Sequence, residues 1–174
     1  DYLKKIKEVA DAVIVIPNWK LIKEDGISIK KAFEWGNEIL VTTIEVISTI
    51  INKPQMMNVD FEDIKTVLRD SSDAYIAMAK MSDKLVTGSK SKGEAVVEEL
   101  MNFPLIDSDT IKKIKRAVLY VEMNSNEDIS IVRDIQGKME NYFQHDSQVI
   151  PGIHFSDDNE DVKDTLIAAH FERE

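Results

Sequence analysis

The longest hydrophobic pattern in the chain lies between residues 27 and 53, where apolar residues recur at spacings of three and four. That spacing is the period of an α-helix. One apolar stripe, expected to face a core, comprises Ile29, Phe33, Leu40, Ile44, Ile47 and Ile51. A second apolar set comprises Trp35, Ile39, Val46 and Ile50. We therefore expect a central helix that is buried from several directions, with Ser28 as its N-cap and Pro54 as its stop.

Upstream of this helix the pattern is shorter and changes period. Residues 1–10 place four apolar side chains on one face of a short helix. The β-branched run at residues 13–16, closed by Pro17, predicts a buried strand. Residues 19–28 contain Gly26 and predict a loop.

Downstream of Pro54, helical and strand patterns alternate, and Asp60 is expected to cap the first of these helices. Polar loops are expected at 82–93 and around Asp107 and Asp109. The order predicts an α/β (α+β) fold: a mostly parallel four-stranded sheet with flanking helices and an antiparallel edge strand from the final hairpin-like pair. The expected helices are 61–69, 94–102 and 129–143, and the expected strands are 74–81, 117–123, 147–155 and 163–171.

Composition narrows the class of partner. The 174 residues carry a formal net charge of -10, so a polyanionic nucleic acid would be repelled. There is no cysteine, no run of apolar residues long enough to span a bilayer and no visible signal peptide, which together predict a cytosolic protein without direct membrane insertion. The first residue is Asp rather than Met, which leaves open that the chain is a fragment.

Several short motifs follow one another in a recognisable order. They are IPN at 16–18, AF at 32–33 followed by Asn37, NVDFEDIKTVL at 58–68, FPLI at 103–106, AVLYVEM at 117–123 with EDISI after it, and TLIAAHF at 165–171. Together they resemble the C-terminal half of FtsZ, the bacterial tubulin-like cell-division GTPase, including its core helix and synergy loop. The chain departs from the family at three places. The family usually has glycine where this chain has Gln55 and His170, and a glycine-rich turn where this chain has Ala77 and Asp83. Because glycine permits unusual backbone conformations, these changes indicate a divergent member.

The resemblance implies a division of the chain into three parts. Residues 1–27 correspond to the last helix and strand of the N-terminal GTP-binding domain, residues 28–53 to the central core helix, and residues 54–174 to the C-terminal, GTPase-activating domain. Nothing in the chain resembles the family's glycine-rich phosphate-binding loop. The strand at 13–16 would then lack its usual sheet, so we expect it to be displaced, poorly ordered or paired with another copy of the chain.

The resemblance also assigns the site residues. Asp60 and Asp63 match the synergy-loop carboxylates that position water at the GTP of the adjacent subunit, and Asn58 matches the polar residue that shapes this loop. Phe33 and Asn37 match the positions that contact the guanine base. Taken alone, however, Asp60 and Asp63 are what an ordinary helix N-terminus contains, and Phe33 and Asn37 are an ordinary core and an ordinary surface residue.

No metal site is expected from the remaining polar residues. His145, His154 and His170 lack acidic partners at ligand spacing and are expected to be structural, and the acidic turn 157–161 lacks the glycine and the spacing of a calcium loop. Met56 and Met57 suit either a contact with a neighbouring subunit or a local plug.

For the full-length protein, the resemblance implies a GTPase that takes GTP with Mg and polymerises head to tail into cytoplasmic filaments at the mid-cell division ring. Its partners would be itself and other cell-division proteins, and the isolated segment would be inactive alone. Two alternatives stay open. One is a non-enzymatic interaction module that caps or co-assembles with filaments. The other is a small α/β ligand-binding domain with an architectural likeness only.

Overall fold

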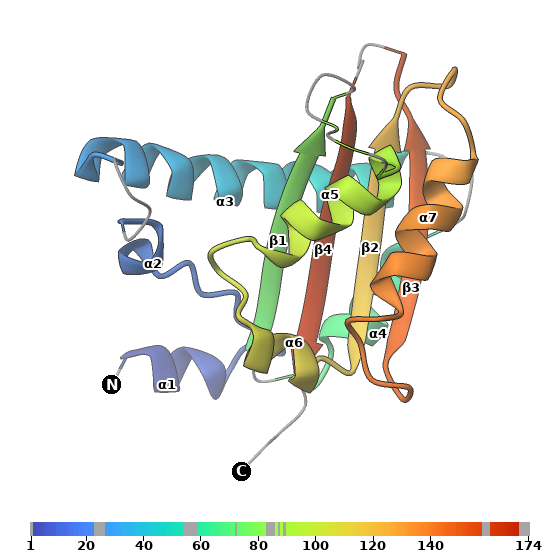
Figure 1. Cartoon of the computed structure of the whole chain (residues 1–174). Coiled ribbons are helices and arrows are strands. Elements are labelled where there is room, and N and C mark those ends of the chain that lie inside the picture. Colours follow the sequence, from blue (N-terminus) through green and yellow to red (C-terminus); the bar gives the residue numbers. More distant parts are fainter. Residues whose placement is uncertain are drawn as a thin grey trace.

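A computed structural model describes residues 2–22, 27–53, 59–71, 73–82, 86, 88, 90–157 and 161–170. A four-stranded sheet stands at the centre, with helices on both of its faces (Figure 1). The strands are β1 (Asp73–Met81), β2 (Arg116–Met123), β3 (Gln148–Phe155) and β4 (Val162–His170). The helices are α1 (Tyr2–Lys7), α2 (Asn18–Ile22), α3 (Ile29–Asn52), α4 (Phe61–Leu68), α5 (Lys92–Met101), α6 (Ser108–Lys113) and α7 (Ser130–Met139). In the part of the chain described, none of the helices is both long and apolar enough to cross a membrane.

The strand order is β1-β4-β2-β3, and β4 runs antiparallel to both of its neighbours while β2 and β3 are parallel. The fold class predicted from the sequence is confirmed, but the position of the antiparallel strand is not. That strand, β4, lies inside the sheet, and the two edges are formed by β1 and β3. Burial explains the arrangement, because the run from Leu166 to Ala169 is fully buried and β3 contains Pro151, which has no N–H to donate to a further strand.

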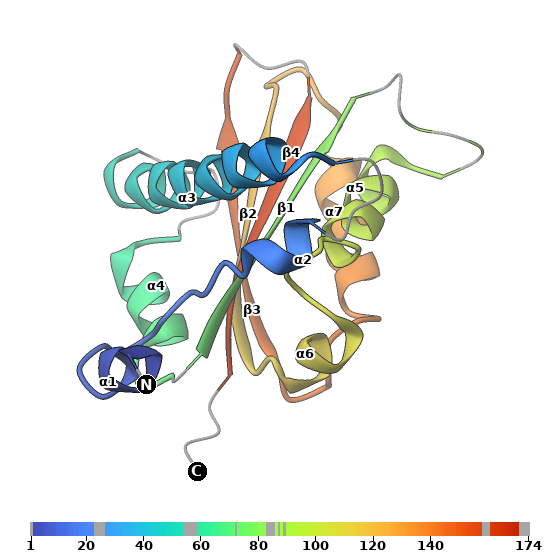
Figure 2. The same ribbon diagram turned by 90° about the vertical axis from the view of Figure 1, so that its left-hand side faces the viewer.

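The helices form two layers. Helices α5 and α7 cover one face of the sheet, and α3 and α4 lie on the other (Figure 2). The α5–α7 pair is close-packed at Gly93, where an added Cβ would lie 2.5 Å from the carbonyl oxygen of Ile131. The first turn of α5 is closed by a capping box between Ser91 and Glu94. This helix begins two residues before the position expected from the sequence.

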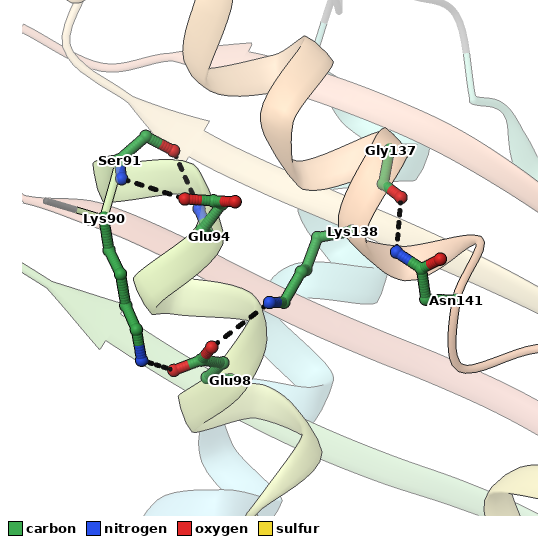
Figure 3. A network of polar contacts seen from close by, with 7 residues as sticks. All are labelled: Lys90, Ser91, Glu94, Glu98, Gly137, Lys138 and Asn141. Carbon is green, nitrogen blue, oxygen red and sulfur yellow. Dashed lines mark hydrogen bonds and ion pairs between the residues drawn. The ribbon is translucent and has the colours of Figure 1, made fainter.

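An ion-pair network joins the outer sides of these two helices (Figure 3). The Glu98 carboxylate on α5 binds Lys90, and its other oxygen lies 3.2 Å from the Lys138 ammonium on α7. Hydrogen bonds from Lys90 and Lys138 lower the pKa of Glu98 from its usual value. The network lies at the protein surface with its side chains 28% to 52% exposed, so it orients the α5–α7 contact rather than adding much stability.

The predicted central helix is present as α3, and its N-cap is Ser28, whose side chain accepts a hydrogen bond from the Lys31 N–H. Its expected burial from several directions is wrong for this chain, because α2 and the sheet together cover only one face of it (Figure 1). The buried face consists of Ala32, Gly36, Ile39, Thr43, Val46 and Ile50. The stripe expected to face a core lies mostly in solvent, with Ile29, Phe33, Leu40, Ile44 and Ile51 between 46% and 65% exposed.

The N-terminal segment also differs from the expectation. Residues 13–16 do not form a strand: Ile14 makes a single parallel bridge to Ala74 of β1, supported by a 3.1 Å bond from the Ala74 N–H to the Val13 carbonyl. The segment therefore contacts the chain's own sheet, contrary to the expected displacement. The expected apolar face of residues 1–10 is also not covered, since α1 has no buried residue.

Two loops predicted from the sequence contain short helices. Helix α2 lies inside the first, and its Leu21 is fully buried beside Gly36 of α3, where an added Cβ would lie 3.6 Å from the leucine side chain. Helix α6 lies inside the second, and its cap Asp107 accepts from the Thr110 N–H at 2.8 Å. Hydrogen bonds from the hydroxyl and N–H of Thr110 lower the pKa of Asp107. At the C-terminal side, α7 is shorter than the predicted helix 129–143.

Candidate functional site

The candidate site is the N-terminus of α4, where Asp60 and Asp63 bind each other's backbone. The Asp60 carboxylate accepts from the Asp63 N–H at 3.0 Å, and the Asp63 carboxylate accepts from the Asp60 N–H at 3.0 Å. This capping box satisfies two N–H groups at the start of the helix. Asn58, the third residue expected in the site, lies outside the described residues, as do Gln55, Met56 and Met57.

Buried residues on both sides of the two carboxylates fix this helix end to the sheet. Val59 is 2% exposed and sits over Gly152 of β3, where an added Cβ would lie 2.9 Å from the valine side chain. Ile64 and Val67 are buried below the helix, and the Arg116 guanidinium of β2 donates to the Thr66 carbonyl at 2.8 Å. The carboxylates are therefore held on a rigid element, with Asp60 exposed and Asp63 partly so.

The charges around the site are not equivalent. Glu62 is paired with Lys65 at 2.8 Å, and this lysine also lies 5.6 Å from the centre of the Phe61 ring. Asp60 and Asp63 form no ion pair with any residue in the described part of the chain. Their mutual bonds use one oxygen of each carboxylate. A second oxygen on each can accept hydrogen bonds from an ordered water or an incoming ligand.

Phe33 and Asn37 lie one turn apart near the start of α3, and both are exposed, Phe33 by 51%. The 24 residues of α3 span about 36 Å. Helix α4, which Asp60 caps, follows the far end of α3 and lies away from its start (Figure 1), so the structure does not bring the two pairs together. An exposed aromatic ring beside an amide offers a stacking surface together with a donor and an acceptor.

Helix α3 carries a large exposed apolar surface, although the sequence pattern predicted that most of these residues face a core. We call the exposed residues Ile29, Phe33, Leu40, Val41, Ile44 and Ile51 the outer face of α3. Exposed apolar residues that gather along one helix mark a surface for another domain or molecule. The outer face runs from Ile29 to Ile51 and includes Phe33, so it overlaps one half of the predicted site.

Two buried polar groups were not identified from the sequence. The Tyr120 hydroxyl has no hydrogen-bond partner in the described residues, and burial followed by the nearby Glu122 charge raises its pKa. Tyr120 is among the residues that line an open cleft of about 1,040 Å³ bordered by α3, the sheet and the end of α5. Asp164 on β4 is 1% exposed, and burial raises its pKa to about 8. The strand patterns do not indicate which side chains will be fully buried, so neither Tyr120 nor Asp164 could have been singled out from the sequence.

The histidines have separate surroundings. The His154 ring stacks on Tyr120 with ring centres 6.3 Å apart, His145 is exposed, and the side chain of His170 lies outside the described part of the structure. Among the described residues, no three acidic, histidine or cysteine side chains come together as a metal site would require.

Comparison with known proteins gives a uniform result, although no protein-family model matches the chain. Cell division protein FtsZ of Haloferax mediterranei is 28% identical over 166 residues, which cover 95% of this chain and 42% of that protein. Cell division protein FtsZ 1 of Archaeoglobus fulgidus is 30% identical over 170 residues, covering 95% of this chain and 43% of that protein. The chain thus spans less than half the length of these relatives.

Solved structures agree with the fold. The empty FtsZ dimer of M. jannaschii matches 98% of this chain and 48% of that chain, with a TM-score of 0.81 and 23% identity. The four-stranded TubZ-Bt filament matches 99% of this chain and 47% of that chain, with a TM-score of 0.70 and 13% identity. At these identities the structures show a shared fold, and together with the sequence relatives they confirm the resemblance to FtsZ.

Proposed function

Because this chain is related to FtsZ over 95% of its length, we propose that it is the central helix and C-terminal half of a filament-forming GTPase of cell division. In this proposal residues 1–27 belong to the end of the GTP-binding domain, residues 28–53 are the core helix, and residues 54–174 activate GTP hydrolysis. The complete protein would act in the cytoplasm at the division site, with further copies of itself and other division proteins as partners.

The observation that carries the proposal is the state of Asp60 and Asp63 at the start of α4: both are at least partly exposed, and neither has an ion-pair partner among the described residues. Phosphoryl transfer to water needs little covalent assistance from a protein, and most of the catalysis comes from positioning and electrostatics. A carboxylate that orients the attacking water suits this requirement. We assign this role to Asp60 and Asp63, acting on the Mg–GTP of the adjacent subunit, and a loop-shaping role to Asn58.

The opposite end of α3 supplies the second half-site in this proposal. Phe33 would pack against the guanine base, and Asn37 would bond to its edge with its amide donor and acceptor. The exposure of both side chains and their one-turn spacing support the assignment. Each molecule would then hold its own nucleotide near the start of α3 and act on its neighbour's nucleotide from the start of α4, which makes GTP turnover depend on assembly.

The outer face of α3 supports the presence of a further domain in the complete protein. Its exposed isoleucine, leucine, valine and phenylalanine side chains form a surface that a GTP-binding domain would cover. The relatives are more than twice as long as the matched segment, since the match covers only 42% and 43% of their lengths. This domain would carry the phosphate-binding elements.

The decisive experiment uses Asp60→Asn in the full-length protein. Asparagine is as good an N-cap as aspartate, so the substitution removes the charge and keeps the helix start. We expect nearly unchanged GTP binding and a loss of GTP turnover of 10²-fold or more. Glu62→Gln is the matched control, because it removes a neighbouring exposed charge that is already paired with Lys65, and it should retain turnover. Undiminished turnover in Asp60→Asn would remove the catalytic assignment.

A further inference from the structure

Asp164 occupies the middle of the sheet, on its central antiparallel strand β4. It is paired with Ala79 of β1 on one side and with Val121 of β2 on the other. Directly opposite residues of an antiparallel pair project from the same face of a sheet, and adjacent residues project from opposite faces. Asp164 therefore shares a face with Ala79 and Val121, and its neighbour Thr165 shares the other face with Tyr120.

The two faces can be told apart by Val59. An added Cβ at Gly152 would lie 2.9 Å from the Val59 side chain and 4.0 Å from the Tyr120 ring, so Tyr120 is on the side of α4 and α3. Asp164 consequently points to the opposite face of the sheet. Helices α5 and α7 cover that face (Figure 2). Helix α5 packs directly on β1 and β4 there.

Among the described residues, no side chain of this layer pairs with the Asp164 carboxylate. Neither oxygen of Asp164 has a hydrogen bond in the described residues, and the residue is 1% exposed. A buried ionised carboxylate without a partner is strongly unfavourable, so such a group keeps its proton or admits water. The buried apolar side chains of α5 and α7 are Val96, Val97, Leu100, Met101, Ile131, Val132, Ile135 and Met139.

The charged groups around Asp164 are engaged elsewhere. On α5, Lys92 is buried and its ammonium binds Glu127, which precedes α7, while Glu94 and Glu98 belong to the capping box and the network of Figure 3. Burial raises the pKa of the fourth acidic or basic group on α5, Glu99, and a hydrogen bond from the Lys80 backbone opposes that shift. On the strands, Lys163 pairs with Glu122 at 3.0 Å and Lys80 with Asp161 at 2.9 Å. On α7, Arg133 contacts Asp134 at 3.9 Å, and Lys138 contacts Glu98 at 3.2 Å.

We propose that Asp164 is a pH-dependent latch of the C-terminal sheet: with its proton the carboxyl stays packed beneath α5 and α7, and on ionisation it draws water into this layer and loosens the two helices. Burial opposes ionisation and is the largest influence on the pKa of Asp164, and the Thr165 N–H acts in the opposite direction. None of the charged groups named above contributes to that shift. The inference does not depend on GTP hydrolysis or on the GTP-binding domain.

The direction of the effect follows from proton binding. In an opened, hydrated layer Asp164 regains an ordinary carboxyl pKa near 3.9, whereas in the closed layer its pKa is about 8. Below both values the two states are equally protonated, so pH does not favour opening. Between them the open state has lost the proton and the closed state has not, so opening becomes about tenfold more favourable with each pH unit. Above pH 8 the effect levels off.

Hydrogen exchange on the 174-residue chain tests the latch. After correction for the intrinsic rates, the exchange of α5 and α7 amides in the wild type should increase about 100-fold between pH 5 and pH 7. Asp164→Asn has nearly the same shape and no titrating proton, and it should show no such increase. An equal increase in Asp164→Asn, or a loss of protection spread evenly over all strands and helices, would overturn the proposal.

A second measurement needs no variant. The carboxyl carbon of Asp164, followed by NMR as a function of pH, should titrate near pH 8 rather than near pH 4. Its midpoint should coincide with the pH at which α5 and α7 exchange reaches its plateau. Titration near pH 4 would show that the closed layer holds an ordinary ionised carboxylate and would also overturn the proposal.

Discussion

Asp60 and Asp63 fix each other at the start of α4 through two reciprocal 3.0 Å hydrogen bonds, each from the backbone N–H of one residue to the carboxylate of the other. The same two side chains that we assign to catalysis therefore also begin a helix. A substitution that removes both roles at once cannot distinguish them. Stability and turnover must be measured on the same pair of variants.

The structural role predicts a difference between two substitutions at one position. Asp60→Ala should lower the free energy of unfolding of the 174-residue chain by about 1 kcal/mol, because the Asp63 N–H loses its acceptor. Asp60→Asn should change the free energy of unfolding by only a few tenths of a kcal/mol, since its amide oxygen replaces the acceptor. Urea unfolding followed by circular dichroism measures both values. Equal losses for the two variants would mean that charge, and not capping, stabilises this helix end.

The α5–α7 contact predicts opposite effects for two glycine substitutions. Gly93→Ala would place a Cβ 2.5 Å from the Ile131 carbonyl oxygen and 3.0 Å from the Asp134 Cβ, so the helices must separate. We expect a loss of about 1–3 kcal/mol in the free energy of unfolding. Gly137→Ala is the control, because nothing lies within 4 Å of its added Cβ and alanine favours a helix, for an expected gain of about 0.5–1 kcal/mol. Thermal unfolding of both variants provides the comparison, and a stable Gly93→Ala chain would contradict the close contact.

Two adjacent residues of α3, one buried and one exposed, predict different stability costs when each is replaced by alanine. Ile39 is 1% exposed and Leu40 is 51% exposed. In the 174-residue chain, Ile39→Ala should cost about 2–5 kcal/mol and Leu40→Ala less than about 1 kcal/mol. In a full-length protein with its GTP-binding domain, the cost of Leu40→Ala should rise toward that of a buried leucine. An unchanged cost in the longer protein would show that no domain covers the outer face of α3.

Replacing the buried carboxylate of Asp164 should raise the free energy of unfolding by an amount that depends on pH. Asp164→Val removes the proton linkage, because valine has no titrating group. The folded-state pKa of Asp164 is raised, so the wild-type chain is progressively destabilised as pH increases from about 4 to 8. The difference in unfolding free energy between variant and wild type should therefore grow by about 1.4 kcal/mol per pH unit in that window and then level off. Chemical unfolding at a series of pH values measures the slope, and a constant difference would refute the linkage.

Much of the fold followed from local patterns. The period of three and four along α3, the Ser28 and Asp60 caps, and the apolar strand segments are properties of neighbouring residues, and the corresponding elements lie close to where they were expected. The short helices α2 and α6 were missed because helices of one or two turns have no repeated pattern to detect, and tertiary contacts such as the burial of Leu21 hold α2 in place.

The candidate site likewise combines features set by neighbouring residues with contacts between distant segments. Residue type and order placed Asp60 and Asp63 at a helix start, and the resemblance to FtsZ gave them a proposed role. Only the structure showed that Val59 and Arg116 fix this end to the sheet, since both contacts join segments far apart in the chain. Burial is likewise non-local, which is why Asp164 could not be recognised as a buried group from its neighbours.

By itself, the sequence determined the periodicities, the helix caps and the order of elements, because each depends on residues within a few positions of one another. Tertiary structure decided which way those elements face. Apolar residues surround much of α3, so its sequence was compatible with burial on any side. The packing covers one face of the helix and leaves the outer face exposed. The same non-local packing placed β4 at the centre of the sheet and Asp164 in the layer beneath α5 and α7.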